Sequence, residues 1–410
     1  MDIIISQDFF PKIGGAHLWL YEVYRRWPSK VNLLTTEYAS YSDEASQQHD
    51  FDKLDHGSLE IIRGLTAIEI INLFDWRCLN QFYNNAKKIS RLKKSKSIIF
   101  LHSLRAFPEG FLGLLFKKMH PNKSRLITYA HGEEILIAQT SRQIRLMTKL
   151  VYSGSDLVIA NSNNTKNLVL DLCPTAKVIC IHPGVNAAEF IQSDHDILAY
   201  RSKWEWSSDK LIVSTIARME ERKNHAMVIR AIGELKNEGI AVNYICGGDG
   251  QEKNNLIRIV NEMGLQQLVH FTGAVTDQEK KLIYGATDIY AMPSIQVGPM
   301  IEGFGIVFLE AAAAGKPSIC GNIGGQSEAV RDGETGLVVD GSSLFDVHQA
   351  VKILVHDADM RVRMGRKGKE WAVEHDWSKI AERTYMAINN LQSSYEQIPQ
   401  TISGSMGGQK

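Results

Sequence analysis

Short unbroken runs of apolar residues alternate with longer segments in which apolar residues recur every three or four positions. Unbroken apolar runs are typical of parallel strands buried on both faces, and the longer pattern is typical of amphipathic helices. The predicted strands are 2–6, 31–35, 97–102, 126–130, 157–160, 178–181, 211–216, 242–246, 269–272, 289–292, 318–320 and 336–339. Helices are predicted between most of them and over 344–355, 359–374 and 377–391. This alternation predicts an α/β protein with parallel sheets.

A polar segment after residue 186 interrupts the series once. We therefore predict two doubly wound, Rossmann-like domains that face a cleft, over residues 1–185 and 186–376. A C-terminal helix, 377–394, and a flexible tail, 395–410, are expected to follow them. Residues 40–60 are polar without a clear period, so we expect an irregular surface excursion there.

The most informative strand-to-helix loop lies within 299–317, where Gly303 and Gly305 precede an alanine-rich helical segment. Free N–H groups at the start of that helix would bind an anion, and the glycines let a ligand approach the backbone. Glu302 in the loop suits sugar hydroxyls, and Glu310 in the helix suits a ribose diol. The stretch therefore predicts a holder for a nucleotide-linked sugar, and a plain loop with a packing helix is the alternative. The backbone of this site would come from Phe304, Gly305, Ile306 and Val307.

The ends of other predicted strands carry further candidate ligand-binding residues. Gly14 and Gly15 follow the first strand, His131 follows 126–130, and Gly248 follows 242–246. Open α/β sheets bind ligands at such strand ends, although a tight turn or a helix-capping histidine would look the same. The sequence contains neither G-x-G-x-x-G, the motif of dinucleotide-binding Rossmann folds, nor G-x-x-x-x-G-K-[ST], the P-loop motif. Both kinds of site are therefore disfavoured.

The sequence gives no reason to expect a metal. Three D-x-D triplets, 50–52, 194–196 and 357–359, all lie in polar segments away from strand ends. The five cysteines are scattered and form no C-x-x-C pair, which favours a reduced compartment without a zinc or disulfide framework. No apolar stretch approaches the roughly 20 residues that span a bilayer, so we expect a cytoplasmic protein.

The formal net charge is zero, but the halves differ. Residues 1–185 carry 23 Lys and Arg against 17 Asp and Glu, and the rest of the chain carries 23 against 29. A basic cluster on a cytoplasmic protein can contact anionic lipid on the inner face of the membrane, and a solvated helix face is the alternative. Nucleic-acid binding is disfavoured because no recognised motif accompanies the charge. The main cluster is Lys87, Lys88, Arg91, Lys93, Lys94 and Lys96.

Taken together, the ordered motifs resemble the GT-B-fold retaining glycosyltransferases of family 4, the glycosyl transferases of group 1. The motif with most weight is Glu302-x7-Glu310 within E-G-F-G-I-V-F-L-E-A-A-A-A-G-K-P. Supporting motifs occur in the same order as in the family: 14–17, 131–132, 161–162, 183–186, Arg218 with Lys223, 248–250, 293–294, 324–325 and 332–336. The block around Glu302 looks most similar to that of the mannosyltransferases.

The resemblance implies a role for each candidate. Arg218 and Lys223 would stabilise the diphosphate of a nucleotide-sugar as it leaves, together with the start of the 304–307 helix. Glu302 and His131 would hold the donor sugar, and Glu310 would hold the ribose. Gly14 and Gly15 would let the backbone of the first domain approach the sugar and the phosphate. The C-terminal helix would return to the first domain.

The implied reaction is the transfer of a hexose, mannose in preference, from a GDP- or UDP-linked sugar to a lipid-linked or saccharide acceptor, as in polysaccharide biosynthesis. The anomeric configuration would be retained because the acceptor hydroxyl attacks the sugar on the face that the leaving phosphate occupies. No metal or other cofactor would be needed. Two alternatives remain from the sequence: a sugar-nucleotide 2-epimerase of GT-B-like fold, and a non-catalytic sugar-nucleotide-binding protein.

Overall fold

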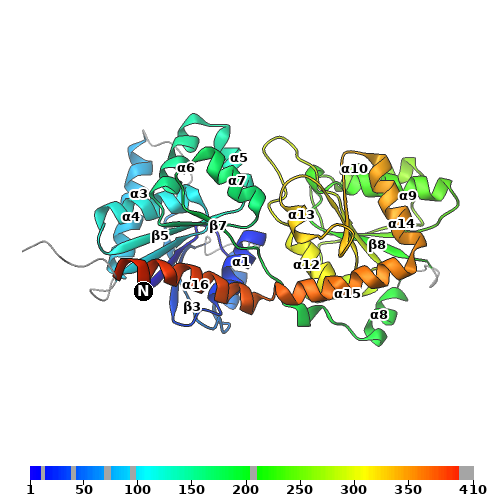
Figure 1. The fold of residues 1–410 in the computed structure, drawn as a ribbon, viewed down its shortest axis with the longest axis horizontal. Helices are drawn as coiled ribbons and strands as arrows, with labels where there is room; N and C mark the ends of the chain where they lie inside the picture. The colour runs from blue at the N-terminus through cyan, green and yellow to red at the C-terminus, as the bar shows by residue number, and fades with distance from the viewer. Residues whose placement is uncertain (11–13, 38–42, 69–74, 93–97, 204–209, 397–410) are drawn as a thin grey trace, which may run out of the picture.

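The computed structural model describes residues 1–10, 14–37, 43–68, 75–92, 98–203 and 210–396. Figure 1 shows two lobes side by side, each built around a parallel sheet with helices on both faces. This arrangement confirms the predicted α/β class with two Rossmann-like units. No helix among these described residues is long and apolar enough to cross a bilayer.

The first sheet has seven strands in the described residues, in the order β3-β2-β1-β4-β5-β6-β7, and all neighbouring pairs are parallel. Its central strands β1 and β4 are mainly apolar because both faces are covered by helices. The strands are β1 Asp2–Ile5, β2 Val31–Thr36, β3 Leu59–Leu65, β4 Ile99–Ser103, β5 Ser124–Ala130, β6 Leu157–Ala160 and β7 Val178–Cys180.

The second sheet repeats the design with six strands in the described part of the chain, in the order β10-β9-β8-β11-β12-β13. It too is parallel throughout. The strands are β8 Ile212–Ile216, β9 Asn243–Gly247, β10 Val269–Gly273, β11 Ile289–Met292, β12 Ser318–Gly321 and β13 Gly336–Val339.

Helices connect most of the consecutive strands, as parallel pairing requires. Those of the first lobe are α1 Gly15–Tyr24, α2 Asp43–Asp52, α3 Trp76–Arg91, α4 Phe111–Met119, α5 Glu133–Gln139, α6 Arg142–Gly154 and α7 Asn163–Leu172. Those of the second are α8 Asp194–Arg201, α9 His225–Asn237, α10 Lys253–Glu262, α11 Asp277–Ala286, α12 Ile306–Ala313, α13 Gln326–Ala329, α14 Leu344–His356 and α15 Ala358–Glu374.

Each sheet reverses its strand order once, between β1 and β4 in the first lobe and between β8 and β11 in the second. At such a reversal the connections leave two adjacent strands toward opposite faces, and a crevice opens beyond their carboxyl ends. The loops after β1, β4, β8 and β11 therefore define where a ligand can enter. This topology positions the site described below.

The expectation of an irregular excursion over 40–60 is wrong. Within that stretch the described residues form α2 and the start of β3, which pairs with β2 in parallel. The strand β3 lies at the sheet edge and carries Glu60 and Arg63, so it lacks the apolar run of a central strand. Helices α5 and α6, between 133 and 154, were not anticipated either.

The last helix, α16 (Trp377–Glu396), leaves the second lobe and lies along the first (Figure 1). It packs on α1, and its residues Trp377, Ile380 and Ile388 are buried in the same cluster as Trp19 and Trp27. The helix therefore covers one face of the first sheet. Residues 397–410, the larger part of the predicted tail, lie outside the described residues.

We expect Ile380→Ala to lower the free energy of unfolding by about 2–5 kcal/mol, because Ile380 is fully buried between α16 and the first sheet and the change leaves a cavity. The matched control is Met386→Ala on the same helix, whose side chain is exposed and should cost less than about 0.5 kcal/mol. Equilibrium urea unfolding measures both. Equal losses in the two variants would show that α16 is not docked as described.

Candidate active site

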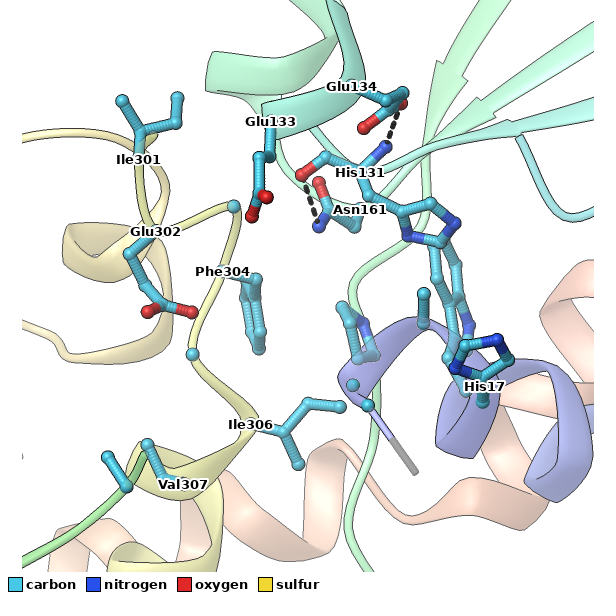
Figure 2. Close-up of a pocket in the computed structure, with 18 of the residues that line it drawn as sticks. His17, His131, Glu133, Glu134, Asn161, Ile301, Glu302, Phe304, Ile306 and Val307 are labelled. Atoms are coloured by element: carbon cyan, nitrogen blue, oxygen red, sulfur yellow. Dashed lines mark hydrogen bonds between the residues drawn. The ribbon is translucent and has the colours of Figure 1, made fainter. Parts of the chain in front are cut away.

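A cleft of about 500 Å³ lies between the carboxyl ends of the two sheets, and both lobes line it. It collects the loops that follow β1, β4, β5, β8 and β11, as the strand-order reversals require. Figure 2 shows the second-lobe loop that carries Glu302 facing Glu133, His131 and His17 of the first lobe. Ten of the twelve predicted site residues line this cleft: Gly14, Gly15, His131, Arg218, Lys223, Glu302, Phe304, Gly305, Ile306 and Val307.

The charge at the centre of the cleft is the carboxylate of Glu302. Its Oε2 atom accepts a hydrogen bond from Arg222 Nη1 at 3.0 Å and a shorter one from Lys223 Nζ. All three side chains are almost completely buried. Burial alone would raise the pKa of Glu302, but the two cations outweigh it and hold that pKa below its usual value. Glu302 is therefore ionised at neutral pH, and it fixes both cations in the cleft.

Arg222 was missed by the sequence reasoning, which selected Arg218 and Lys223 from the same loop. The side chain of Arg218 is 71% exposed and pairs with Glu220 at 2.7 Å, whereas that of Arg222 is only 8% exposed. Glu220 also pairs with Arg222 Nε at 3.1 Å. The sequence contains a hint in the adjacent Arg222-Lys223, but only the short helical turn 221–223 directs both side chains inward.

Helix α12 begins at the cleft wall. Gly305 caps it with φ 89°, a left-handed conformation that a side chain would strain, and a Cβ there would meet the Phe308 ring at 2.6 Å. The N–H groups of Ile306 and Val307 belong to its first turn, where a helix of this length favours an anion. Lys223 and this helix start therefore concentrate positive potential on one side of the cleft.

His131 is a neutral hydrogen-bonding group in the opposite wall. Its Nε2 lies 2.7 Å from the carbonyl oxygen of Leu104 and must carry the proton that it donates. Burial lowers the pKa of His131 to about 4, so the ring is uncharged at neutral pH and Nδ1 keeps a lone pair. The backbone is fixed as well: Glu134 accepts from the His131 N–H at 2.7 Å, and Asn161 donates to its carbonyl (Figure 2).

The first-lobe residues of the cleft that were not selected from the sequence as site residues include His17 on α1 and Arg105 after β4. Burial, with the nearby charge of Arg105, lowers the pKa of His17 to about 4. Arg105 lies 3.7 Å from the buried Glu109. A histidine in a helical pattern and an arginine after a strand carry no signal by themselves, and only the fold brings them together.

Glu310 and Gly248 do not line this cleft. The Glu310 carboxylate accepts from Lys280 at 2.7 Å and from the Tyr284 hydroxyl at 2.9 Å, and it borders a smaller adjacent cavity. Gly248 (φ 127°) packs behind the loop of Arg218, where a Cβ would lie 2.1 Å from the Ala217 carbonyl oxygen. Their assignment to the donor stays a prediction.

The D-x-D triplets have structural partners. Asp52 forms an ion pair with Arg63 at 2.7 Å, Asp196 accepts from the Ser193 hydroxyl, and Asp357 caps α15 by accepting from the Met360 N–H at 2.7 Å. None of the three contributes to the lining of the cleft.

Residues 196–371 match the family model "Glycosyl transferases group 1". This match covers most of the second lobe, which is therefore a group 1 glycosyltransferase domain. Together with the named glycosyltransferase relatives, it confirms the predicted enzyme class.

Similarity extends over almost the whole chain. A GDP-mannose-dependent alpha-(1-6)-phosphatidylinositol monomannoside mannosyltransferase of Mycobacterium tuberculosis is 27% identical, covering 93% of this chain and 96% of that protein. Its counterpart in Mycolicibacterium smegmatis is 26% identical, covering 91% and 94%.

Solved structures share the two-lobe fold. The Anabaena protein Alr3699/HepE, crystallised with UDP, superposes with a TM-score of 0.78 at 18% identity over 95% of this chain and 99% of its own. Sucrose-phosphate synthase of Thermosynechococcus elongatus gives a TM-score of 0.76 at 20% identity over 96% and 99%. The fold of this glycosyltransferase is therefore GT-B.

The depressed pKa of His131 predicts a loss of stability in mild acid. Between pH 6.5, where an unfolded histidine titrates, and about 4, only the unfolded chain binds the proton, so stability falls as pH falls through this window. The full effect is on the order of 3 kcal/mol. His131→Asn should therefore show a weaker pH dependence of the unfolding midpoint than the wild type. Identical pH profiles would contradict the assignment.

Proposed function

We propose that this glycosyltransferase moves a hexose, mannose in preference, from a GDP- or UDP-linked donor to a hydroxyl of a lipid-linked or saccharide acceptor. The observation that supports this most is the pair of cations Arg222 and Lys223 on Glu302, which line the same cleft as the start of α12. Mannose is favoured by the names of the mycobacterial relatives, and a nucleotide diphosphate by the UDP in the Anabaena structure.

In this proposal the donor diphosphate lies between the start of α12 and the side chains of Lys223 and Arg218. Negative charge grows on the diphosphate as the sugar–phosphate bond breaks, and fixed cations in a cleft with little water stabilise it. Glu302 is then free to accept hydrogen bonds from the sugar hydroxyls. His131, with Nδ1 as an acceptor, would orient another hydroxyl from the first lobe.

Retention of configuration follows if the acceptor hydroxyl attacks from the face that the leaving phosphate occupies. The phosphate oxygen then takes the hydroxyl proton, and catalysis depends on positioning and electrostatics. Two cations supply the charge that a metal supplies elsewhere, so we propose that turnover needs no metal.

Incubation with GDP-mannose, UDP-glucose and an ADP-sugar tests the donor, with release of nucleotide diphosphate as the readout. We expect GDP-mannose to be hydrolysed slowly without acceptor and to raise the thermal midpoint most. EDTA should leave the rate unchanged. Release of diphosphate from none of these donors would overturn the proposal, and a loss in EDTA restored by Mg²⁺ would overturn metal independence.

Lys223→Ala should lower kcat by roughly 10²-fold, because a cation that meets the leaving phosphate acts mainly in the transition state. The matched control is Lys253→Ala, which removes a cation of the second lobe that pairs with the exposed Asp249 outside the cleft. Steady-state kinetics, with a thermal midpoint for each variant, separate catalysis from folding. Near-normal turnover of Lys223→Ala would remove the electrostatic role.

We also propose that α3 contacts an anionic membrane surface. Trp76, Leu79 and Tyr83 are exposed along one side of this helix, and Lys87 continues the row, with its Nζ 5.4 Å from the Tyr83 ring centroid.

The predicted basic cluster lies at the end of the same helix. Arg91 is exposed there, whereas Lys88 donates to the Gly64 carbonyl and is partly buried. Lys93, Lys94 and Lys96 lie outside the described residues. An apolar row beside basic residues is typical of interfacial helices.

Co-sedimentation with vesicles that contain anionic lipid should exceed co-sedimentation with neutral vesicles, and Trp76→Ser should reduce it several-fold. Leu146→Ser on α6 is the control, because it removes an exposed apolar side chain from another helix. Equal binding to neutral and anionic vesicles would remove the proposal.

A further inference from the structure

A thiol, an imidazole and a carboxylate meet where the two lobes touch. Cys180 is the last residue of β7, His182 follows two positions later, and Glu328 lies on α13 of the other lobe. One ligand atom from each lies within 4.8 Å of the others, and all three residues are partly exposed. Neither the family assignment nor the roles above use this cluster, and none of its members lines the cleft.

The carboxylate of Glu328 is already held in place. Its two oxygens accept from the backbone N–H groups of Asn163 at 2.7 Å and Asn164 at 2.8 Å, at the start of α7 in the first lobe. The Asn163 side chain donates to it as well, at 2.9 Å. Ligand carboxylates in metal sites are typically fixed by such outer hydrogen bonds.

The imidazole is equally constrained. The ring of His182 stacks on Phe304 at a centroid distance of 5.0 Å and on His375 at 5.7 Å. Its Nε2 lies 3.0 Å from Glu328 Oε2, so the nitrogen points at the carboxylate rather than at solvent. The ring therefore needs no reorientation to exchange its Nε2 proton for a cation.

We propose that Cys180, His182 and Glu328 bind one Zn²⁺ ion, with water as the fourth ligand. Thiolate, imidazole and carboxylate together suit zinc, whereas Mg²⁺ and Ca²⁺ prefer oxygen ligands alone. Bonds of about 2.0–2.3 Å to a shared ion are compatible with three atoms this close together. Binding forms Zn–S, Zn–N and Zn–O bonds. The Sγ proton leaves to solvent, and the imidazole binds through Nε2 as the neutral tautomer that carries its proton on Nδ1.

Such an ion would join the two lobes. Glu328 belongs to α13 of the second lobe, while Cys180 and His182 extend from the first sheet. Donor entry and product release between two lobes need the lobes to separate, and a three-point link across them opposes that step. Zn²⁺ is thus an inhibitor that acts away from the reacting groups, which is consistent with turnover that needs no metal. This consequence rests on the proposed function, whereas ion binding itself does not.

Titration of the full-length protein with Co²⁺, a spectroscopic substitute for Zn²⁺, tests the site without an activity assay. We expect one ion per chain and a thiolate-to-cobalt charge-transfer band, which Zn²⁺ abolishes. Cys180→Ala should eliminate the band, and Glu328→Gln should weaken binding at least about tenfold. Cys173→Ala removes a buried thiol elsewhere in the same lobe and should keep the band. A wild type without the band, or a band that survives in Cys180→Ala, would overturn the site.

The inhibition is measured separately. Micromolar Zn²⁺ should slow multiple turnover of the wild type at least about tenfold, and Cys180→Ala should resist it while keeping its activity without zinc. Equal inhibition of both would show that zinc acts elsewhere. If no donor supports turnover, the proposed function fails while the Co²⁺ result still decides the site.

Discussion

Both sheets reverse their strand order once, and most of the charged groups in the candidate site come from the loops at those reversals. Parallel strands end at the same edge of a sheet, so the loops after β1, β4, β8 and β11 converge on two facing crevices. Gly14 and Gly15, Arg105, the 218–223 segment and the 301–307 segment come from these loops. The chemistry of the enzyme therefore depends on a topological constraint before it depends on any side chain.

Within that cleft the dominant interaction is the ion pair of Glu302 with Lys223 and Arg222. A buried cation without a partner costs several kcal/mol, so carboxylates of the cleft must pair with the buried cations when no donor is bound. Glu302 does this for Lys223 and Arg222, and Glu220 also pairs with Arg222. The same cations are then available for a diphosphate, because a donor replaces one set of negative oxygens with another.

The lobes are held in contact by polar groups of the backbone as much as by side chains. A Cβ on Gly303 would lie 2.0 Å from the His131 carbonyl oxygen, and one on Gly325 would lie 2.8 Å from the Ser162 hydroxyl oxygen of the first lobe. Glu328 caps the start of α7 across the same boundary. Glycines at these positions let the two lobes approach, which explains why the loops that carry them are the family's recognisable motifs.

Continuous apolar runs identified most strands, because a strand covered on both faces consists mainly of apolar residues. The same reasoning missed β3, whose Glu60 and Arg63 are tolerated at a sheet edge, and α2, which has few apolar residues. The partners of Glu310, Lys280 and Tyr284, could not be predicted from the sequence either, and the assignment of Glu310 to the donor stays a prediction. The local pattern of apolar and polar residues predicts burial well, but it does not predict which partner a charged side chain will contact.

The sequence by itself determined the α/β class, the glycosyltransferase motif around Glu302 and the loops that form the cleft, because hydrophobic periodicity and glycine placement are local properties. Only the tertiary structure decided that Arg222 rather than Arg218 contacts Glu302, that His131 is neutral, and that α16 covers the first lobe. These depend on residues far apart in the chain, whose distances, burial and charges are set when the two lobes pack together.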